Sequence, residues 1–325
     1  MRRIALLTAL LLAIAACNGD ETGATTTLPE ASSSTTVGGT TTTASVPSTT
    51  EVESFPVTVT DATGEVTIEA EPHSIVSLSS TATEMLFAIG AGDQVVAVDE
   101  FSTYPEEAPR TDLSGFTPNL EAIIGYQPDL VVISFDPGEL QSGLETVGVP
   151  SLLLPTALSL GDSYTQIEVL GAATGHIGEA AEVVGQMRRD IVSAVAGADI
   201  PDGISFYHEV DGTLYSTTSS SFLGQIYALL GLENIADAAD DGSGFPQLAS
   251  EYIVAADPDL IFLGDVDFGV TPESLSERPG WEGMTAVQNQ AIVGLDSYLA
   301  SNWGPRVVEL VELIADAVSE LTPVR

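Results

Sequence analysis

Glu121-Ala-Ile-Ile-Gly-Tyr-Gln-Pro-Asp-Leu-Val-Val-Ile133 is the stretch that decides the fold, because the chain contains a second copy of it. The second copy reads Glu251-Tyr-Ile-Val-Ala-Ala-Asp-Pro-Asp-Leu-Ile-Phe-Leu263, with Glu, Ile, Pro, Asp and Leu at the same offsets. Each copy predicts a short helix that ends at proline, followed by a strand. The strand is an uninterrupted apolar run, which is typical of a parallel strand covered on both faces. The duplication therefore predicts two similar α/β lobes.

The sequence around the two copies completes this plan. Apolar runs predict strands at 75–78, 95–98, 152–154, 204–208 and 291–294. Between the lobes, five apolar residues recur at helical spacing and predict one long helix over 178–196: Ala181, Val184, Met187, Ile191 and Val195. The predicted fold class is α/β, with two doubly wound, three-layer αβα lobes joined by one long helix and a cleft between them.

Composition divides the chain into five segments. Arg2 and Arg3 precede an apolar run that is too short to span a bilayer and that predicts a signal peptide. Cys17, the only cysteine, follows Ile14-Ala-Ala and resembles the lipidated cysteine of bacterial lipoproteins. The alternative is an ordinary signal peptide with an incidental cysteine. The predicted segments are a signal peptide (1–16), a lipidated cysteine and flexible stalk (17–53), an N-terminal lobe (54–160), connecting helices (161–197) and a C-terminal lobe (198–325).

The composition of the predicted stalk and the net charge of the chain both limit the functions that the chain can have. Residues 22–50 hold 17 serines or threonines and no apolar periodicity, so they cannot bury enough surface to offset the entropy of ordering. Removal of Arg2 and Arg3 with the signal changes the net charge from −39 to −41. This charge excludes nucleic acid as a partner and argues against an anionic ligand held by a broad basic patch.

Aromatic residues follow several predicted strands of the first lobe. Phe101 and Tyr104 lie in the loop after strand 95–98, Phe116 lies in a loop before the repeated helix, and Phe135 follows strand 130–133. Ligands of open α/β sheets gather beyond the carboxyl ends of the strands. These aromatics are therefore candidates for a ligand site, with the alternative that they only fix the conformation of their loops.

Four motifs carry a resemblance to a known family. They are Ser-Leu-Ser-x-x-x-Thr-Glu at 77–84, Asn-Leu-Glu-x-Ile at 119–123, Pro-Asp-Leu-Val at 128–131 and Asn-Trp-Gly-Pro-Arg at 302–306. Together they resemble the substrate-binding proteins of vitamin B12 and ferric-siderophore ABC importers, over residues 72–320. The resemblance implies an exported, monomeric binding protein that has no catalytic activity or cofactor. Its lipid would be its only attachment to the outer face of the cell membrane.

The resemblance also implies a set of ligand contacts. The family's cleft aromatics match Phe101, Phe116, Phe135, Tyr215 and Phe245. An Asp of its last loop best matches Asp296, whereas the Arg that follows in the family has no counterpart, and Asn302 or Trp303 stands nearby. The expected ligand-binding residues are Phe101, Tyr104, Phe116, Phe135, Tyr215, Phe245, Asp296 and Trp303. An aromatic cleft suits a large, partly apolar, planar ligand.

These contacts lead to an expected ligand and partner. We expect cobalamin or another corrinoid, with a ferric hydroxamate siderophore as the alternative and haem after it, because few arginines remain to hold an iron catecholate. By resemblance, Glu121 and Glu251, the first residue of each repeat copy, meet arginines on the permease dimer of an ABC importer. The alternative is that both acids only interact with the helix dipole.

Catalytic and metal-binding signatures are weak. His73, His176 and His208 lie far apart and in no metal-ligand spacing, so we expect no metal site. The pair His208-Glu209 could perform acid–base chemistry, but no Gly-x-Ser-x-Gly or phosphate-loop motif accompanies it. A lipid-anchored hydrolase remains a remote alternative to the binding protein.

Overall fold

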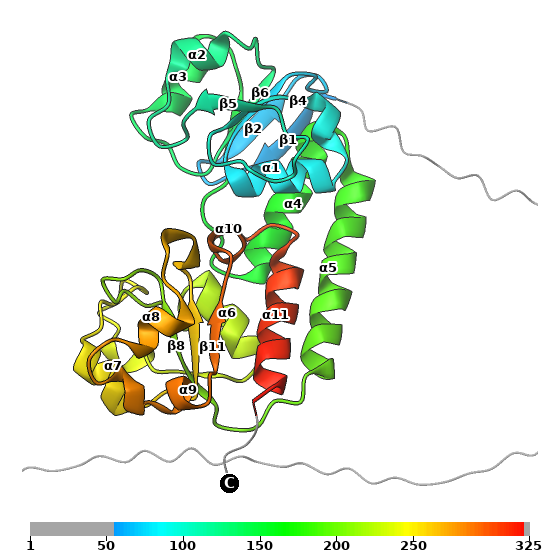
Figure 1. Cartoon of the computed structure of the whole chain (residues 1–325). Coiled ribbons are helices and arrows are strands. Elements are labelled where there is room, and N and C mark those ends of the chain that lie inside the picture. Colours follow the sequence, from blue (N-terminus) through cyan, green and yellow to red (C-terminus); the bar gives the residue numbers. More distant parts are fainter. Residues whose placement is uncertain (1–54, 322–325) are drawn as a thin grey trace, which may run out of the picture. The chain divides into compact units, whose positions relative to one another are not determined.

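The computed structural model describes residues 55–321, which belong to one compact unit (Figure 1). The predicted signal peptide, Cys17 and the predicted stalk over 17–53 lie outside the described residues. Among the helices of residues 55–321, none is both long enough and apolar enough to cross a membrane.

The first lobe is built on a parallel sheet with the strand order β5-β4-β3-β6-β7. Its strands are β3 (Ile75–Leu78), β4 (Val95–Asp99), β5 (Arg110–Leu113), β6 (Leu130–Ile133) and β7 (Ser151–Leu153). Its helices are α1 (Ser80–Ala88), the 3₁₀ helix η1 (Ala91–Gln94), α2 (Leu120–Ile124) and α3 (Leu140–Thr146). The side chains of Ser79 and Asn119 cap α1 and α2 by accepting bonds from the third residue beyond each.

The second lobe repeats this plan with the parallel strand order β11-β10-β8-β9. Its strands are β8 (Ser205–Glu209), β9 (Glu233–Asn234), β10 (Leu260–Leu263) and β11 (Ile292–Gly294). Its helices are α6 (Phe222–Leu229), α7 (Ser250–Ala256), α8 (Pro272–Ser276), α9 (Thr285–Gln288), α10 (Ser297–Ser301), α11 (Val307–Ser319) and the 3₁₀ helices η2 (Asp237–Ala239), η3 (Val266–Phe268) and η4 (Trp281–Gly283). Ser221 caps α6 as Ser79 caps α1.

Two helices connect the lobes. Helix α4 (Leu160–Thr174) ends at Gly175, which adopts a left-handed conformation, and α5 (Ile177–Gly197) follows. Helix α5 runs alongside α4 and α11 (Figure 1). Its length of about 30 Å, at 1.5 Å per residue, lets one helix reach both sheets.

Three apolar cores hold these layers. The first is continuous through both lobes and contains α1, α4, α5, α6, α11 and one face of each sheet. The second lies between the other face of the second sheet and α7, α8 and α9. The third lies between the other face of the first sheet and α2 and α3. Each sheet is thus covered on both faces, which explains why every residue of β6 and β10 is buried.

The repeated stretch adopts the same structure in both lobes. Gln127 and Asp257, each before the shared Pro-Asp, have positive φ angles of 53° and 48°. The Asp129 carboxylate accepts a bond from the His73 backbone N–H (2.9 Å), and the Asp259 carboxylate accepts one from Ser205 (2.9 Å). The shared aspartate therefore ties each repeat strand to the start of its neighbouring strand, which confirms the predicted duplication of the fold.

One element was missed from the sequence, and one expectation about α5 needs correction. A hairpin of β1 (Val57–Thr60) and β2 (Glu65–Ile68) precedes the first sheet, although we did not predict it. Its alternating pattern around a Gly-containing turn is a signal that would have found it. On α5, Val184, Met187 and Ile191 are buried as expected, but Ala181 is exposed and Ala180 packs against Gly171 instead.

Candidate functional site

Three aromatic side chains meet at the carboxyl edge of the first sheet. Phe101 follows β4, Phe116 follows β5 and Phe135 follows β6. The Phe101 and Phe116 ring centroids are 5.3 Å apart at 88°, and the Phe116 and Phe135 centroids are 5.4 Å apart at 48°. Despite these contacts, the three residues are 38, 61 and 40% exposed. We call Phe101, Phe116 and Phe135 the aromatic triad.

Buried polar groups fix the loops that carry the triad. The Asp99 carboxylate accepts bonds from Ser102 Oγ (2.7 Å) and Ser102 N (3.0 Å), and Ser102 is bonded to Thr83 on α1 (2.9 Å). Burial raises the pKa of Asp99, while the bonds from Ser102 oppose this shift. A Cβ on Gly115 would lie 2.6 Å from the Leu78 carbonyl, so only glycine lets the loop with Phe116 pass this close to β3.

Tyr104 lies at the same edge but belongs to a different set of contacts. The Arg306 guanidinium lies 4.1 Å from the centroid of its exposed ring. Arg306 also forms an ion pair with the buried Glu84 of α1 (2.5 Å). Burial raises the pKa of Glu84, against the lowering effect of Arg306. Tyr104 therefore lies where the first lobe meets the segment before α11.

The two aromatics predicted in the second lobe lie on loops that pair with each other. Tyr215 forms an isolated bridge with Gln247, and Ser216 N donates to the Pro246 carbonyl (2.9 Å). Tyr215 and Phe245 are both exposed. Asp296 is also exposed, and its carboxylate caps α10 by accepting a bond from Leu299 N (2.7 Å). The loops that carry Tyr215 and Phe245 are thus joined through backbone pairing of Tyr215 and Ser216 with Gln247 and Pro246.

Trp303 is the one expected contact that the structure places in the interior. It is 8% exposed, its indole N–H donates to Gln166 (2.7 Å), and Ser163 donates to its carbonyl (2.5 Å). Its neighbour Asn302 accepts bonds from Ser80 (2.9 Å) and Thr81 (2.8 Å) on α1. Asn302 and Trp303 thus join the segment between α10 and α11 to α1 and α4, and Trp303 has little free surface for a ligand.

Two exposed aromatics that we did not single out from the sequence also lie at the carboxyl edge of the second sheet. Phe268 follows β10, and Tyr298 follows β11. The sequence carries the same signal for both residues as for Phe135, namely an aromatic residue shortly after an apolar run that predicts a strand.

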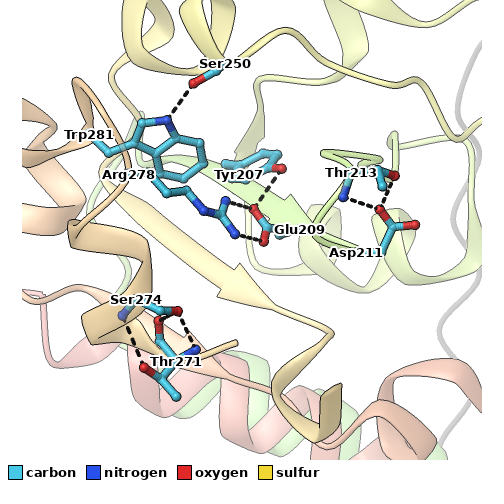
Figure 2. A network of polar contacts seen from close by, with 9 residues as sticks. All are labelled: Tyr207, Glu209, Asp211, Thr213, Ser250, Thr271, Ser274, Arg278 and Trp281. Atoms are coloured by element: carbon cyan, nitrogen blue, oxygen red, sulfur yellow. Dashed lines mark hydrogen bonds and ion pairs between the residues drawn. The ribbon is translucent and has the colours of Figure 1, made fainter. Parts of the chain in front are cut away.

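Glu209 and Arg278 form a second buried network at the carboxyl end of β8, shown in Figure 2. Two guanidinium nitrogens donate to the two carboxylate oxygens, both at 2.6 Å, and the Tyr207 hydroxyl also donates to Glu209 (3.3 Å). The guanidinium lies 4.7 Å from the Trp281 ring centroid, and the Trp281 N–H donates to Ser250 of α7 (2.7 Å). The bonds to Glu209 raise the pKa of Arg278, so the guanidinium remains charged.

This network removes the basis for acid–base chemistry at His208-Glu209. Glu209 is fully buried and bonded to Arg278, and the His208 ring bonds to the Tyr227 hydroxyl (2.9 Å). Burial lowers the pKa of His208 to about 4, so its ring is neutral near pH 7. Both side chains therefore have structural partners and no access to a substrate.

Asp265 lies beside this network without a partner of its own. It is 2% exposed, and neither carboxylate oxygen has a hydrogen bond within the described part of the chain. Burial, followed by the charge of Glu209, raises its pKa to about 6. Asp265 is thus an unpaired acid at the end of the central strand β10.

Glu121 and Glu251 occupy matching, exposed positions in the first turns of α2 and α7. Neither side chain has a hydrogen bond or ion pair among the described residues. Both acids are consequently exposed and unpaired within residues 55–321.

Two hollows of the described chain lie away from these residues. Clusters of residues that could bind a metal are absent from the described chain. Hollows of about 1230 and 970 Å³ lie beside β2 and α3 and beside β11 and α11, and the aromatic triad lines neither of them. No group of three His, Cys, Asp or Glu residues within 55–321 could hold a metal ion.

The sequence matches the family described as periplasmic binding protein over residues 75–299. The chain belongs to this family. The resemblance seen in the four motifs is therefore confirmed, and the family is one of binding proteins instead of enzymes.

Three similar proteins illustrate the relationship. An ABC transporter substrate-binding lipoprotein of Bacillus subtilis, YvrC, is 32% identical over 82% of this chain and 87% of its own length. A cobalamin-binding protein of Halobacterium salinarum is 31% identical over 83% of this chain and 76% of its own. The solved structure of the periplasmic heme-binding protein RhuT from Roseiflexus sp. RS-1 shares the fold, with a TM-score of 0.68, 24% identity and coverage of 77% and 98%.

Proposed function

We propose that the protein captures cobalamin or another corrinoid at the aromatic carboxyl edges of its lobes and delivers it to an ABC importer. The observation that carries the proposal is the aromatic triad, whose rings contact one another yet stay exposed. A joined aromatic surface at the carboxyl edge of a parallel sheet is suited to ligand binding, because such a ligand gains both burial and stacking. The name of the H. salinarum relative supports the same ligand.

The charges near the site favour a ligand without strong negative charge. Arg110 donates to the Thr103 carbonyl, Arg278 pairs with Glu209, and Arg306 pairs with Glu84. The other described arginines, Arg188 and Arg189, lie on α5, where Arg188 stacks over Tyr164 of α4 and Arg189 donates to Gln186 of α5. Because Arg278 and Arg306 are held by carboxylates, few guanidinium groups of residues 55–321 are left to bind a catecholate or a carboxylate of the ligand. A corrinoid with neutral amide side chains suits this surface.

A neutral ferric hydroxamate is the second candidate, because the same charge argument admits it. Haem is less well supported, since its two propionates would need cations. The three histidines also lie elsewhere: His73 before β3, His176 at the start of α5 and His208 buried in β8. None of them is at the triad to ligate haem iron.

Titration decides between these ligands. Quenching of intrinsic fluorescence is measured with cyanocobalamin, a neutral ferric hydroxamate and haemin. We expect cyanocobalamin to bind below about 10 μM, which corresponds to roughly −7 kcal/mol. Phe116→Ala should weaken binding, whereas Tyr126→Ala, an exposed aromatic after α2, should not. Failure of cyanocobalamin to bind would contradict the proposal, and binding of the hydroxamate alone would favour the second candidate.

We also propose that the chain is exported and held at the outer face of the cell membrane by lipid on Cys17. The sequence before the cysteine supports this, and the B. subtilis relative is named a lipoprotein. Cys17→Ser should release the protein from the membrane fraction and abolish its labelling by a fatty acid. Continued membrane association of the variant would contradict a lipid anchor.

A further inference from the structure

Phe268 is the most exposed of the large apolar side chains within residues 55–321, at 84%. It ends η3, the short 3₁₀ helix that follows β10. Strand β10 lies inside the second sheet, between β11 and β8, so the loop after it leaves from the middle of the carboxyl edge. An isolated exposed apolar residue is ordinary on a protein surface. Phe268 differs from such a residue in two respects: it lies in the middle of the carboxyl edge, and its loop is held by hydrogen bonds.

The duplicated fold places another exposed phenylalanine after the matching strand of the first lobe. Strands β6 and β10 are the strands of the two repeat copies. Phe135 lies shortly after β6, and Phe268 lies shortly after β10, three residues beyond the position that aligns with Phe135. Phe135 belongs to the aromatic triad. The two lobes thus carry an exposed phenylalanine after equivalent strands.

The loop that carries Phe268 is fixed on both sides. The Asp267 carboxylate accepts bonds from Ser297 N (3.0 Å) and Ser297 Oγ (2.6 Å), which tie η3 to the start of α10. These bonds lower the pKa of Asp267, so its charge persists well into the acid range. On the other side, the Phe268 backbone N–H donates to the Asp265 carbonyl (3.0 Å). The Val266 side chain covers Gly294, where an added Cβ would lie 2.8 Å away.

This arrangement holds the backbone while leaving the ring in solvent. A ring that is presented by a rigid loop loses little conformational entropy when a ligand covers it. Ser297 also immediately precedes the exposed Tyr298, so the same two bonds position a second ring at this edge.

We propose that Phe268 is a ligand contact of the second lobe and that the Asp267–Ser297 bonds position it. The proposal rests on the proposed function and adds a specific requirement to it. The ligand must be broad enough to cover aromatic rings on both lobes, which favours a large ring system over a compact iron complex.

Equilibrium and stopped-flow titrations with cyanocobalamin test the contact. Phe268→Ala should weaken binding about tenfold, chiefly through faster dissociation. Phe268→Trp should retain binding, since it restores an aromatic surface. Asp267→Ala should weaken binding by a smaller factor, while Tyr126→Ala serves as the control for removing an exposed ring.

The outcomes separate this contact from the function on which it rests. If the wild-type protein binds cyanocobalamin, Phe116→Ala weakens binding and Phe268→Ala binds like the wild type, the contact is wrong and the function stands. Equal losses of cyanocobalamin affinity in Phe268→Ala and Tyr126→Ala would also contradict the proposed contact. If the wild-type protein does not bind cyanocobalamin, both proposals fail together.

Discussion

Asp265 shows how one side chain can make the protein sensitive to pH. Its pKa is raised to about 6 from an ordinary value of 3.8, first by burial and then by the charge of Glu209, which is paired with Arg278. Between these two pH values the folded state binds more protons than the unfolded state. Stability therefore falls as pH rises through this window and does not recover above pH 6.

Asp265→Asn should stabilise the protein at pH 7.5 and have little effect at pH 4, because the amide removes the unpaired charge. We expect a gain of roughly 1–2 kcal/mol at pH 7.5, allowing for screening by solvent. Urea unfolding at the two pH values measures it, with the exposed Asp202→Asn as the matched control. An equal gain at both pH values would show that the charge of Asp265 is not the cause.

Helices α2 and α7 carry the prediction that concerns the importer. Glu121 and Glu251 are exposed and have equivalent positions, one on each lobe. A permease dimer offers two equivalent sites, so paired acids suit it better than a single one. Charge pairs across such an interface mainly guide association and orientation.

Glu121→Ala and Glu251→Ala should each leave the dissociation constant of the ligand unchanged and reduce stimulation of the importer's ATPase. The double variant should abolish stimulation. The ATPase stimulation by each variant is measured with the importer in proteoliposomes. Glu282→Ala, which changes an exposed acid of η4, is the control. Normal ATPase stimulation together with a loss of about 0.3–1 kcal/mol in stability would mean that the acids act only on the helix dipole.

The elements differ in how well the sequence predicted them. The strands of the repeat were predictable, because an apolar run and a duplicated motif constrain them strongly. Hairpin β1–β2 was missed because its short, half-polar strands lie outside the repeat. The site residues were harder to predict from the sequence than the strands. Trp303 was expected at the ligand, but burial of an indole depends on a distant partner, Gln166, which no local pattern reveals.

At the scale of the whole molecule, the connection between lobes limits their motion. Helix α5 packs on α4 and α11 (Figure 1), and Glu84 of α1 is bonded to Asn302 (3.0 Å) and Arg306 beyond α10. Rotation of one lobe against the other would bend a long helix and expose buried charges. Such rotation is costly, because a buried ion that loses its partner is strongly destabilising.

Ligand binding should therefore change the radius of gyration very little. Small-angle X-ray scattering with and without cyanocobalamin measures this change. Asn302→Ala, which removes the bonds from Ser80 and Thr81, should permit a larger change. A large decrease in the wild-type radius of gyration would contradict the expected rigidity.

The apolar core shared by α4, α5, α11 and both sheets has an evolutionary consequence. A polypeptide with only one lobe would leave an apolar face of its sheet and helices uncovered in water. The repeat indicates that the chain arose by duplication of such a unit. A single-lobe ancestor of this kind would need a cover for that face, which a second identical subunit could supply. Gene fusion would then have preserved a homodimer interface as the interior of one chain.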